Sequence, residues 1–317
     1  MPNTTFIAVC VAAVLVLAGC SSSATPEATD TPAPEATTTT TAWPVDITTA
    51  ELTPVDFPAP ALGGDERILA LAVGSGEVVE LLGAGELLVG RDETSSIAGD
   101  APIVTQGHQI DMERALALTP TIVLVDELSG PPEAIEALAN RGASIVQVPS
   151  VWTLADIDDR VRAIAEGIGV DNAVADQLAN QLTPTAITNQ TRPRVAFLYL
   201  RGPSAVYLLG GQSSGADALI EAAGGIDVGA ELGYDGFVPL TAEAIAQADP
   251  EVFLVMSDGL DSVGGVDGLL SLPGIAQTKA GREQRIVSVD DRVLLSFGSR
   301  TPSLIDKLAQ VFTQVNA

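Results

Sequence analysis

Two residues in this sequence, His108 and Tyr234, are of types that bind iron. His108 is the only histidine among 317 residues and lies in a Gln-Gly-His-Gln stretch, and Tyr234 lies in a Gly-Tyr-Asp-Gly stretch. Neutral imidazole is the commonest side-chain metal ligand, and tyrosine phenolate is an axial ligand of haem iron. Two ligands are too few for a bare metal ion, but they suffice where a porphyrin supplies the remaining donors. Each residue also has an ordinary interpretation, as a solvated loop histidine and as a rim or core tyrosine.

The segments around these residues alternate between strand and helix patterns. Apolar runs typical of buried strands occupy residues 67–73, 87–93, 121–127, 144–150, 194–200, 205–211 and 251–257, and helical patterns occupy 75–85, 111–120, 131–143, 215–225, 241–250 and 301–315. This alternation predicts an α/β fold with mainly parallel sheets. Residues 152–191 have a helical pattern throughout and predict one long connecting helix.

A pattern in the first half of the chain recurs in the second half. At a shift of 130 residues, Asp111 matches Thr241, and each is followed by a glutamate, a proline and an apolar strand. Asp and Thr are both good helix N-caps, so the repeat predicts two Rossmann-like lobes joined by the connecting helix. His108 lies three residues before the first cap and Tyr234 seven residues before the second. We therefore expect both side chains to face a ligand-binding cleft between the lobes.

The N-terminal segment contains signals for export. Residues 1–19 contain a short apolar run that ends in small residues, as in a signal peptide. Cys20 follows this run in the Leu-Ala-Gly-Cys pattern of a lipoprotein. The segment before the run lacks Lys and Arg, and an ordinary signal peptide with a chance cysteine is the alternative. Residues 20–60 are rich in Thr, Pro and Ala and predict a disordered tether. We expect a lipoprotein anchored to the outer face of the cell membrane, with lobes at 61–151 and 192–317.

Charge and motifs exclude several classes of protein. The formal charge is −26, which argues against nucleic-acid binding, because such binding depends on Lys and Arg at the phosphates. The sequence has no second histidine, and no nucleophile-plus-acid set accompanies His108, so we expect no enzyme. The glycine-rich residues 262–269 lack the Lys-Ser/Thr of a phosphate-binding loop. Met112 and Met256 are soft iron ligands in principle, but their patterns favour core packing.

From about Arg67 to Ala317, the chain resembles the substrate-binding lipoproteins of iron-chelate and cobalamin ABC importers, and among them the haem-binding members. The resemblance rests on GHQIDMERALALTPTIVLV, on GYDGFVPLTAEAIAQADPEVFLVMSDGLDSVGGVDGLLSLPGIAQTKAG and on VLLSFGSRTP. It implies the class III periplasmic-binding-protein fold, with haem b as transported ligand and no catalytic cofactor. It also implies that His108 and Tyr234 coordinate the haem iron. An ABC permease and its ATPase would receive the haem, and haem-donor surface proteins would be further partners. A ferric siderophore or cobalamin is the alternative cargo.

The resemblance also suggests roles for charged residues. The haem propionates need nearby positive charge, which arginine supplies bidentately. The candidates are Arg91, Arg114, Arg201 and Arg300, of which Arg300 matches the family motif best. Acidic residues at the outer tip of each lobe would dock on permease arginines, and the candidates are Glu133 or Glu136 and Asp261 or Asp267. The chain departs from the family at one point, because an arginine commonly follows shortly after the tyrosine, whereas Asp235 and Gly236 follow Tyr234.

Overall fold

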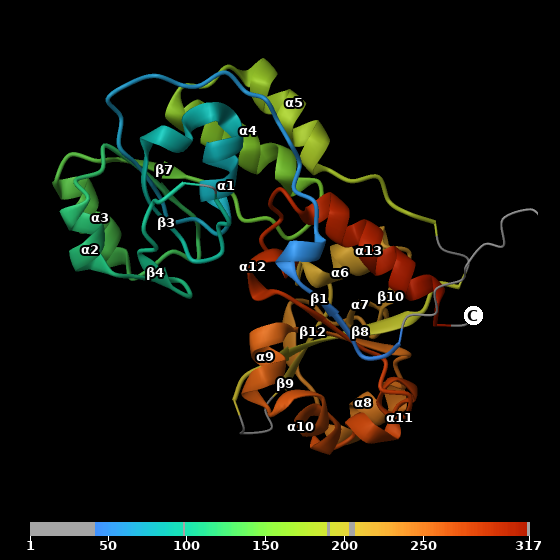
Figure 1. The fold of residues 1–317 in the computed structure, drawn as a ribbon. Helices are drawn as coiled ribbons and strands as arrows, with labels where there is room; N and C mark the ends of the chain where they lie inside the picture. The colour runs from blue at the N-terminus through green and yellow to red at the C-terminus, as the bar shows by residue number, and fades with distance from the viewer. Residues whose placement is uncertain (1–41, 98, 189–190, 203–206, 316–317) are drawn as a thin grey trace, which may run out of the picture. The chain divides into compact units, whose positions relative to one another are not determined.

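The computed structural model describes residues 42–97, 99–188, 191–202 and 207–315 (Figure 1). The predicted signal peptide, Cys20 and residues 21–41 of the predicted tether lie outside these described residues. Within the described part of the chain, no helix is both long and apolar enough to span a bilayer.

The first lobe is built on a parallel sheet with strand order β3-β2-β6-β7. Its strands are β2 (Ile68–Ala70), β3 (Leu88–Arg91), β6 (Ile122–Val125) and β7 (Ser144–Gln147), with a separate antiparallel hairpin of β4 (Thr105–Gln106) and β5 (Gln109–Ile110). Its helices are α1 (Ser75–Val79), which continues as η2 (Glu80–Ala84) and η3 (Gly85–Leu87), then α2 (Met112–Ala117) and α3 (Pro132–Asn140).

The second lobe contains a larger, mixed sheet with order β1-β13-β12-β8-β9-β11, and β10 also pairs with β8. Its strands are β1 (Val45–Ile47), β8 (Arg194–Leu200), β9 (Tyr207–Gly210), β10 (Ile226–Asp227), β11 (Phe237–Pro239), β12 (Val252–Met256) and β13 (Ile286–Val289). Its helical segments are η1 (Thr49–Glu51), α6 (Ala216–Ala222), α7 (Val228–Glu231), α8 (Ala242–Ala248), α9 (Ser257–Ser262), α10 (Gly265–Ser271), η4 (Ile275–Gln277), α11 (Lys279–Arg282), α12 (Asp291–Leu294) and α13 (Thr301–Thr313). Only β9 and β11 run antiparallel to their described neighbours in this sheet.

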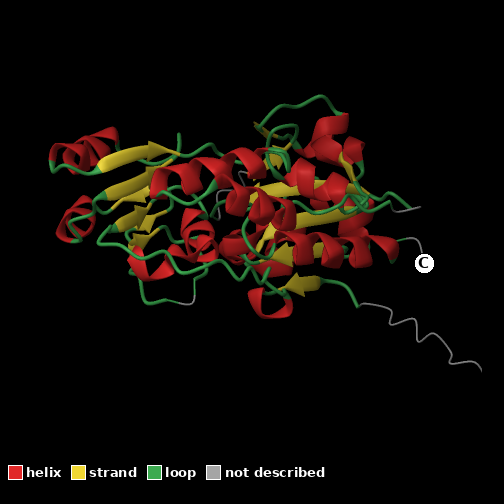
Figure 2. Ribbon diagram, turned by 90° about the horizontal axis from the view of Figure 1, so that it is seen from above, coloured by secondary structure: helices red, strands yellow, loops and turns green. Residues whose placement is uncertain are grey.

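Helices cover both faces of each sheet, which explains the continuous apolar runs of the strands (Figure 2). On β6, Val123 packs in the cluster that contains Leu138 of α3. Its neighbour Leu124 points to the opposite face, because side chains alternate along a strand, and joins the cluster of Val78 and Val161. The fold class predicted from the alternating pattern is confirmed.

The two predicted helix caps are also confirmed. The Asp111 side chain accepts a hydrogen bond from the backbone N of Arg114, and the Thr241 side chain accepts one from the backbone N of Ala244. Each capped helix, α2 or α8, is followed by a buried parallel strand, β6 or β12. The internal repeat therefore reflects a real structural correspondence between the lobes.

The predicted tether is too long at its C-terminal end. Residues Val45–Ile47 form β1, which pairs in parallel with β13, and Ile47 is completely buried. Leu52 is also buried, and the backbone N of Val55 donates to the carbonyl of Ser299. Residues 45–55 therefore belong to the second lobe, because their few apolar side chains find partners far away in the sequence.

The connector is a pair of helices, and the prediction of one long helix over 152–191 is wrong. It consists of α4 (Asp156–Ile168) and α5 (Asn172–Leu182), which pack against each other. Gly169 ends α4 in the left-handed conformation, with φ of 79°, which glycine adopts without a Cβ penalty. Asp171 then caps α5 by accepting a hydrogen bond from the backbone N of Ala173. These two local signals outweigh the helical pattern of the whole segment.

Candidate ligand-binding site

A cavity of about 450 Å³ is lined by residues of both lobes and of the connector. Most of its lining follows the carboxyl ends of parallel strands: Leu71 and Val73 after β2, Asp92, Glu93 and Thr94 after β3, Asp126 and Leu128 after β6, Ser150, Val151 and Trp152 after β7, Tyr199 and Arg201 at the end of β8, Met256 at the end of β12 and Asp291 after β13. This is the edge at which open α/β sheets bind ligands, and the volume suits a small-molecule site.

His108 lines this cavity from the first lobe. It lies in the two-residue turn between β4 and β5, where Gly107 has a φ of 56°. The turn is held by its backbone: the N of Gly130 donates to the carbonyl of His108 at 3.0 Å, and the N of Gly107 donates to Glu93 Oε1 at 2.6 Å. The imidazole itself is exposed and is therefore accessible to a ligand in the cavity.

Tyr199 lines the same cavity from the second lobe. Its phenol oxygen accepts a hydrogen bond from Arg201 Nε at 2.7 Å and another from Arg201 Nη2. The guanidinium carbon lies 5.0 Å from the centre of the Tyr199 ring, and Phe237 packs on that ring at 5.4 Å. Two donors of one permanent cation therefore hold the phenol oxygen at the cavity.

Tyr234, the predicted partner of His108, does not belong to the cavity lining. Its backbone N donates to the carbonyl of Gly229, its carbonyl accepts from the N of Gln212, and its half-buried side chain packs on the second-lobe core. The sequence-based placement failed because β11 lies between Tyr234 and α8, and Phe237 of that strand reaches the cavity instead.

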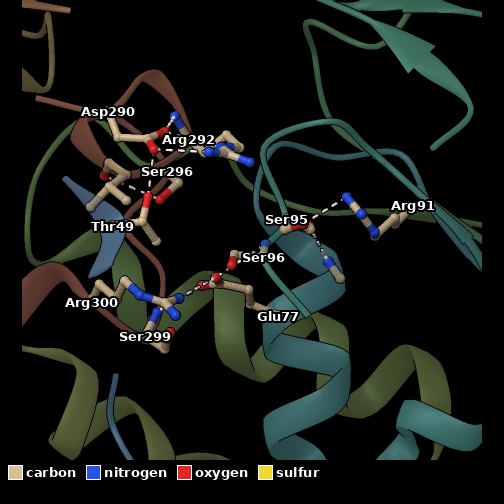
Figure 3. A network of polar contacts seen from close by, with 12 residues as sticks. Thr49, Glu77, Arg91, Ser95, Ser96, Asp290, Arg292, Ser296, Ser299 and Arg300 are labelled. Carbon is tan, nitrogen blue, oxygen red and sulfur yellow. Dashed lines mark hydrogen bonds and ion pairs between the residues drawn. The ribbon is translucent and has the colours of Figure 1, made fainter. Parts of the chain in front are cut away.

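Of the four arginines predicted to lie near the ligand, only Arg201 lines the cavity. Arg91 donates through Nη1 to the carbonyl of Ser95 at 2.8 Å, and Arg114 donates through Nη1 to the carbonyl of Ile103 at 2.8 Å. Figure 3 shows Arg300 directed at Glu77, with Nη1 3.5 Å from Oε1. Arg91, Arg114 and Arg300 do not line the cavity and each has a protein partner, so their predicted ligand contacts are not supported.

Glu77 joins the two lobes next to the cavity (Figure 3). Its carboxylate accepts hydrogen bonds from the backbone N of Ser96 at 3.1 Å, in the first lobe, and of Ser299 at 2.9 Å, in the second. Burial raises the pKa of Glu77, while the hydrogen bond from Ser299 and the charge of Arg300 oppose this shift. A buried carboxylate with these partners is a structural link between lobes.

The cavity also contains acidic side chains. Burial raises the pKa of Asp92, against hydrogen bonds from Ser95 and Thr94, and burial likewise raises that of Asp291, against a hydrogen bond from the backbone N of Asp258. Among the residues that the structure describes, no group of three or more His, Cys, Asp or Glu side chains could hold a metal ion.

A family model described as "Periplasmic binding protein" matches residues 68–293. The chain belongs to the periplasmic binding protein family. This result confirms the resemblance drawn from the sequence and agrees with the two α/β lobes described above. Comparison of this periplasmic binding protein with curated sequences gave no match.

Solved structures similar to this periplasmic binding protein are named as haem-binding proteins. The haem-binding protein RhuT from Roseiflexus sp. RS-1, in its apo form, is 35% identical, with a TM-score of 0.72 over 80% of this chain and 99% of its own. The haem-binding protein HmuT is 31% identical, with a TM-score of 0.72 over 82% of this chain and 94% of its own. BhuT in complex with two haems is 30% identical, with a TM-score of 0.68 over 80% of this chain and 100% of its own.

Other residues singled out in the sequence are now located. Glu133 and Glu136 on α3, Asp261 on α9 and Asp267 on α10 are all exposed. Met112 is 47% exposed, so its predicted core position is wrong, and Met256 borders the cavity.

Sequence reasoning missed Tyr199 and three other lining residues, Trp152, Arg160 and Phe237. A usable signal for Tyr199 was present: a tyrosine and an arginine, two positions apart, end the predicted strand 194–200. The resemblance implies an arginine shortly after the ligand tyrosine. None follows Tyr234, but Arg201 follows Tyr199 by two positions.

Proposed function

We propose that this protein binds haem in the cavity between its lobes, with His108 and Tyr199 as axial ligands of the iron, and delivers it to an ABC permease. The observation that carries the proposal is that the chain's one histidine and an arginine-bound tyrosine line one cavity from opposite lobes. Imidazole nitrogen and phenol oxygen are both axial ligands of haem iron. Tyr199 replaces Tyr234 in this assignment.

The rest of the cavity supports a planar, largely apolar ligand. Trp152 and Phe237 present aromatic surface, and Leu71, Leu128, Leu208 and Leu295 present aliphatic surface. The structural relatives are named as haem-binding proteins. The alanine variants of HmuT include one of a histidine, one of a tyrosine and one of an arginine two positions after that tyrosine, which is the spacing of Tyr199 and Arg201.

The proposal describes a carrier that performs no chemistry on its cargo. On this proposal, the export signal at 1–19 and lipid on Cys20 keep the protein at the outer face of the cell membrane. Exposed acids at the outer helices, Glu133 or Glu136 and Asp261 or Asp267, would contact the permease.

A hemin titration followed by visible spectroscopy tests the proposal. The wild-type chain should give a sharp Soret band, and both His108→Ala and Tyr199→Phe should shift this band and weaken binding. Tyr234→Phe is the matched control, since it removes a phenol outside the cavity, and its spectrum should equal that of the wild type. No Soret band with wild-type protein would favour a ferric siderophore or cobalamin as cargo. A change in Tyr234→Phe without one in Tyr199→Phe would refute the ligand assignment.

A further inference from the structure

Arg160 is a buried cation at the cavity, and no pattern in the sequence singled it out. It lies on α4 of the connector, is 3% exposed and lines the cavity together with Ser296 of the second lobe. Of the described residues that line this cavity, only Arg160 and Arg201 are arginine or lysine. Arg201 already donates twice to Tyr199, so Arg160 is the other permanent cation available to a ligand.

Most of the donor capacity of Arg160 is unused. A guanidinium has five N–H donors, and Arg160 donates through Nη1 to the carbonyl of Ser296 at 2.7 Å. Its Nε is buried without a hydrogen-bond partner, and no described carboxylate forms an ion pair with it within 4.0 Å. Buried polar groups in proteins nearly always have partners, so a buried guanidinium that lines a cavity with one backbone acceptor and no carboxylate partner indicates a ligand group that pairs with it.

The surrounding acids keep Arg160 charged without occupying it. Burial lowers its pKa to about 10, while Asp126, Asp92, Glu77 and Asp156 oppose this shift, so the side chain remains a cation at neutral pH. None of these carboxylates forms an ion pair with Arg160, and each accepts hydrogen bonds from other donors. Asp126, for example, accepts from the backbone N of Val73, Leu128 and Ser129, and Asp156 accepts from those of Trp152 and Thr153.

We infer that Arg160 binds a carboxylate of the cargo, which for haem is one propionate, and thereby selects a dianionic porphyrin and fixes its orientation. The inference rests on the proposed function. Four acids, Asp92, Glu93, Asp126 and Asp291, also line the cavity and repel a propionate, so Arg160 is the point at which a buried charge attracts one. Arginine suits this role because its planar fork matches a carboxylate bidentately.

Four titrations of the full chain in detergent test this role: wild type and Arg160→Met, each with hemin and with hemin dimethyl ester, whose propionates carry no charge. Removing a hydrogen-bonded charge pair should weaken hemin binding roughly tenfold to hundredfold. The affinity for the ester should fall by no more than about threefold, because the ester offers Arg160 no anion. Each porphyrin partitions into detergent to the same extent with both proteins. This partition therefore cancels when the dissociation constant of the variant is divided by that of the wild type.

Three further measurements make the outcome decisive. Arg162→Met is the matched control, since Arg162 lies on the same helix, is exposed and pairs with Asp158 and Asp176, and it should bind both porphyrins as the wild type does. Arg160→Lys keeps the charge and should restore part of the hemin affinity, and it replaces Arg160→Met if that variant does not fold. The Soret band of each variant should stay at the wild-type position, since the axial ligands are intact.

Equal losses for hemin and for its ester would overturn the inference and leave Arg160 a purely structural residue. Failure of the proposed function looks different: hemin binding would then be absent in the wild type, or would be unaffected in His108→Ala and Tyr199→Phe.

Discussion

Asp227 gives this protein a pH-dependent stability whose size follows from the structure. The side chain lies at the end of β10, is 2% exposed and caps α7 by accepting a hydrogen bond from the backbone N of Ala230 at 2.6 Å. Its Oδ2 is buried with no hydrogen-bond partner in the described part of the chain. Burial, with the charges of Asp217 and Glu221, raises its pKa from 3.8 to about 7.

The direction of this pH dependence follows from the number of protons that the folded and unfolded states bind. Between these pKa values the folded state keeps the proton on Asp227 and the unfolded state loses it, so the free energy of unfolding falls as pH rises. At 1.36 kcal/mol per pKa unit, the loss between about pH 5 and about pH 8 is about 2.5 kcal/mol. Asp227→Asn keeps an oxygen for Ala230 and cannot ionise, so its stability relative to the wild type should rise by that amount over this range.

Urea unfolding of both proteins at several pH values measures this difference. The buried amide is expected to change the free energy of unfolding of Asp227→Asn by a constant amount at every pH. Only the change with pH in the difference between the two proteins tests the reasoning. Asp111→Asn is the matched control, because Asp111 is an exposed N-cap of α2. An offset for Asp227→Asn that does not vary between about pH 5 and about pH 8 would show that Asp227 is ionised in the folded protein.

Two further substitutions test the site and the second lobe. Arg201→Met removes both donors to the Tyr199 phenol and should weaken hemin binding roughly tenfold, with a shifted Soret band; an unchanged titration would mean that the phenol needs no such support. Gly229→Ala places a Cβ 2.0 Å from the backbone carbonyl oxygen of Gly210 and should destabilise the protein by about 1–3 kcal/mol in thermal unfolding. Gly63→Ala, with no atom within 4 Å of the new Cβ, is its control, and equal melting of the two variants would contradict the packing argument.

Local signals in the sequence were sufficient for the architecture of this protein but not for the extent of the second lobe. Hydrophobic periodicity and the caps Asp111 and Thr241 predict the alternating elements, because each depends on a few neighbouring residues. β1 could not be predicted in this way, since Val45 pairs with Val287 at the far end of the chain. Such a pairing depends on the assembled sheet, and three residues of strand pattern do not stand out in a segment rich in Thr and Pro.

The proposed iron ligands show a similar division. His108 was identified because no other histidine exists, whereas Tyr234 was chosen because an internal repeat was taken to extend to the loops. The lobes share strands and capped helices, but the first lobe has the β4–β5 hairpin before its helix and the second has β11. Loops diverge more readily than the elements that they connect. The carboxyl end of β8, a strand predicted from the sequence alone, was the better guide, and it ends in Tyr199 and Arg201.

The position of Arg300 shows what a site shared by two lobes requires. Its sequence motif pointed to the ligand, yet its side chain pairs with buried Glu77 across the lobes. On the proposed function, His108 and Tyr199 bind one iron from different lobes, so a small change in lobe spacing would break one of the two bonds. Removing one partner of a buried ion pair costs several kcal/mol, which makes the Glu77–Arg300 contact a strong restraint on that spacing. On this proposal, a residue outside the cavity supports haem coordination by holding the two halves of the site at one distance.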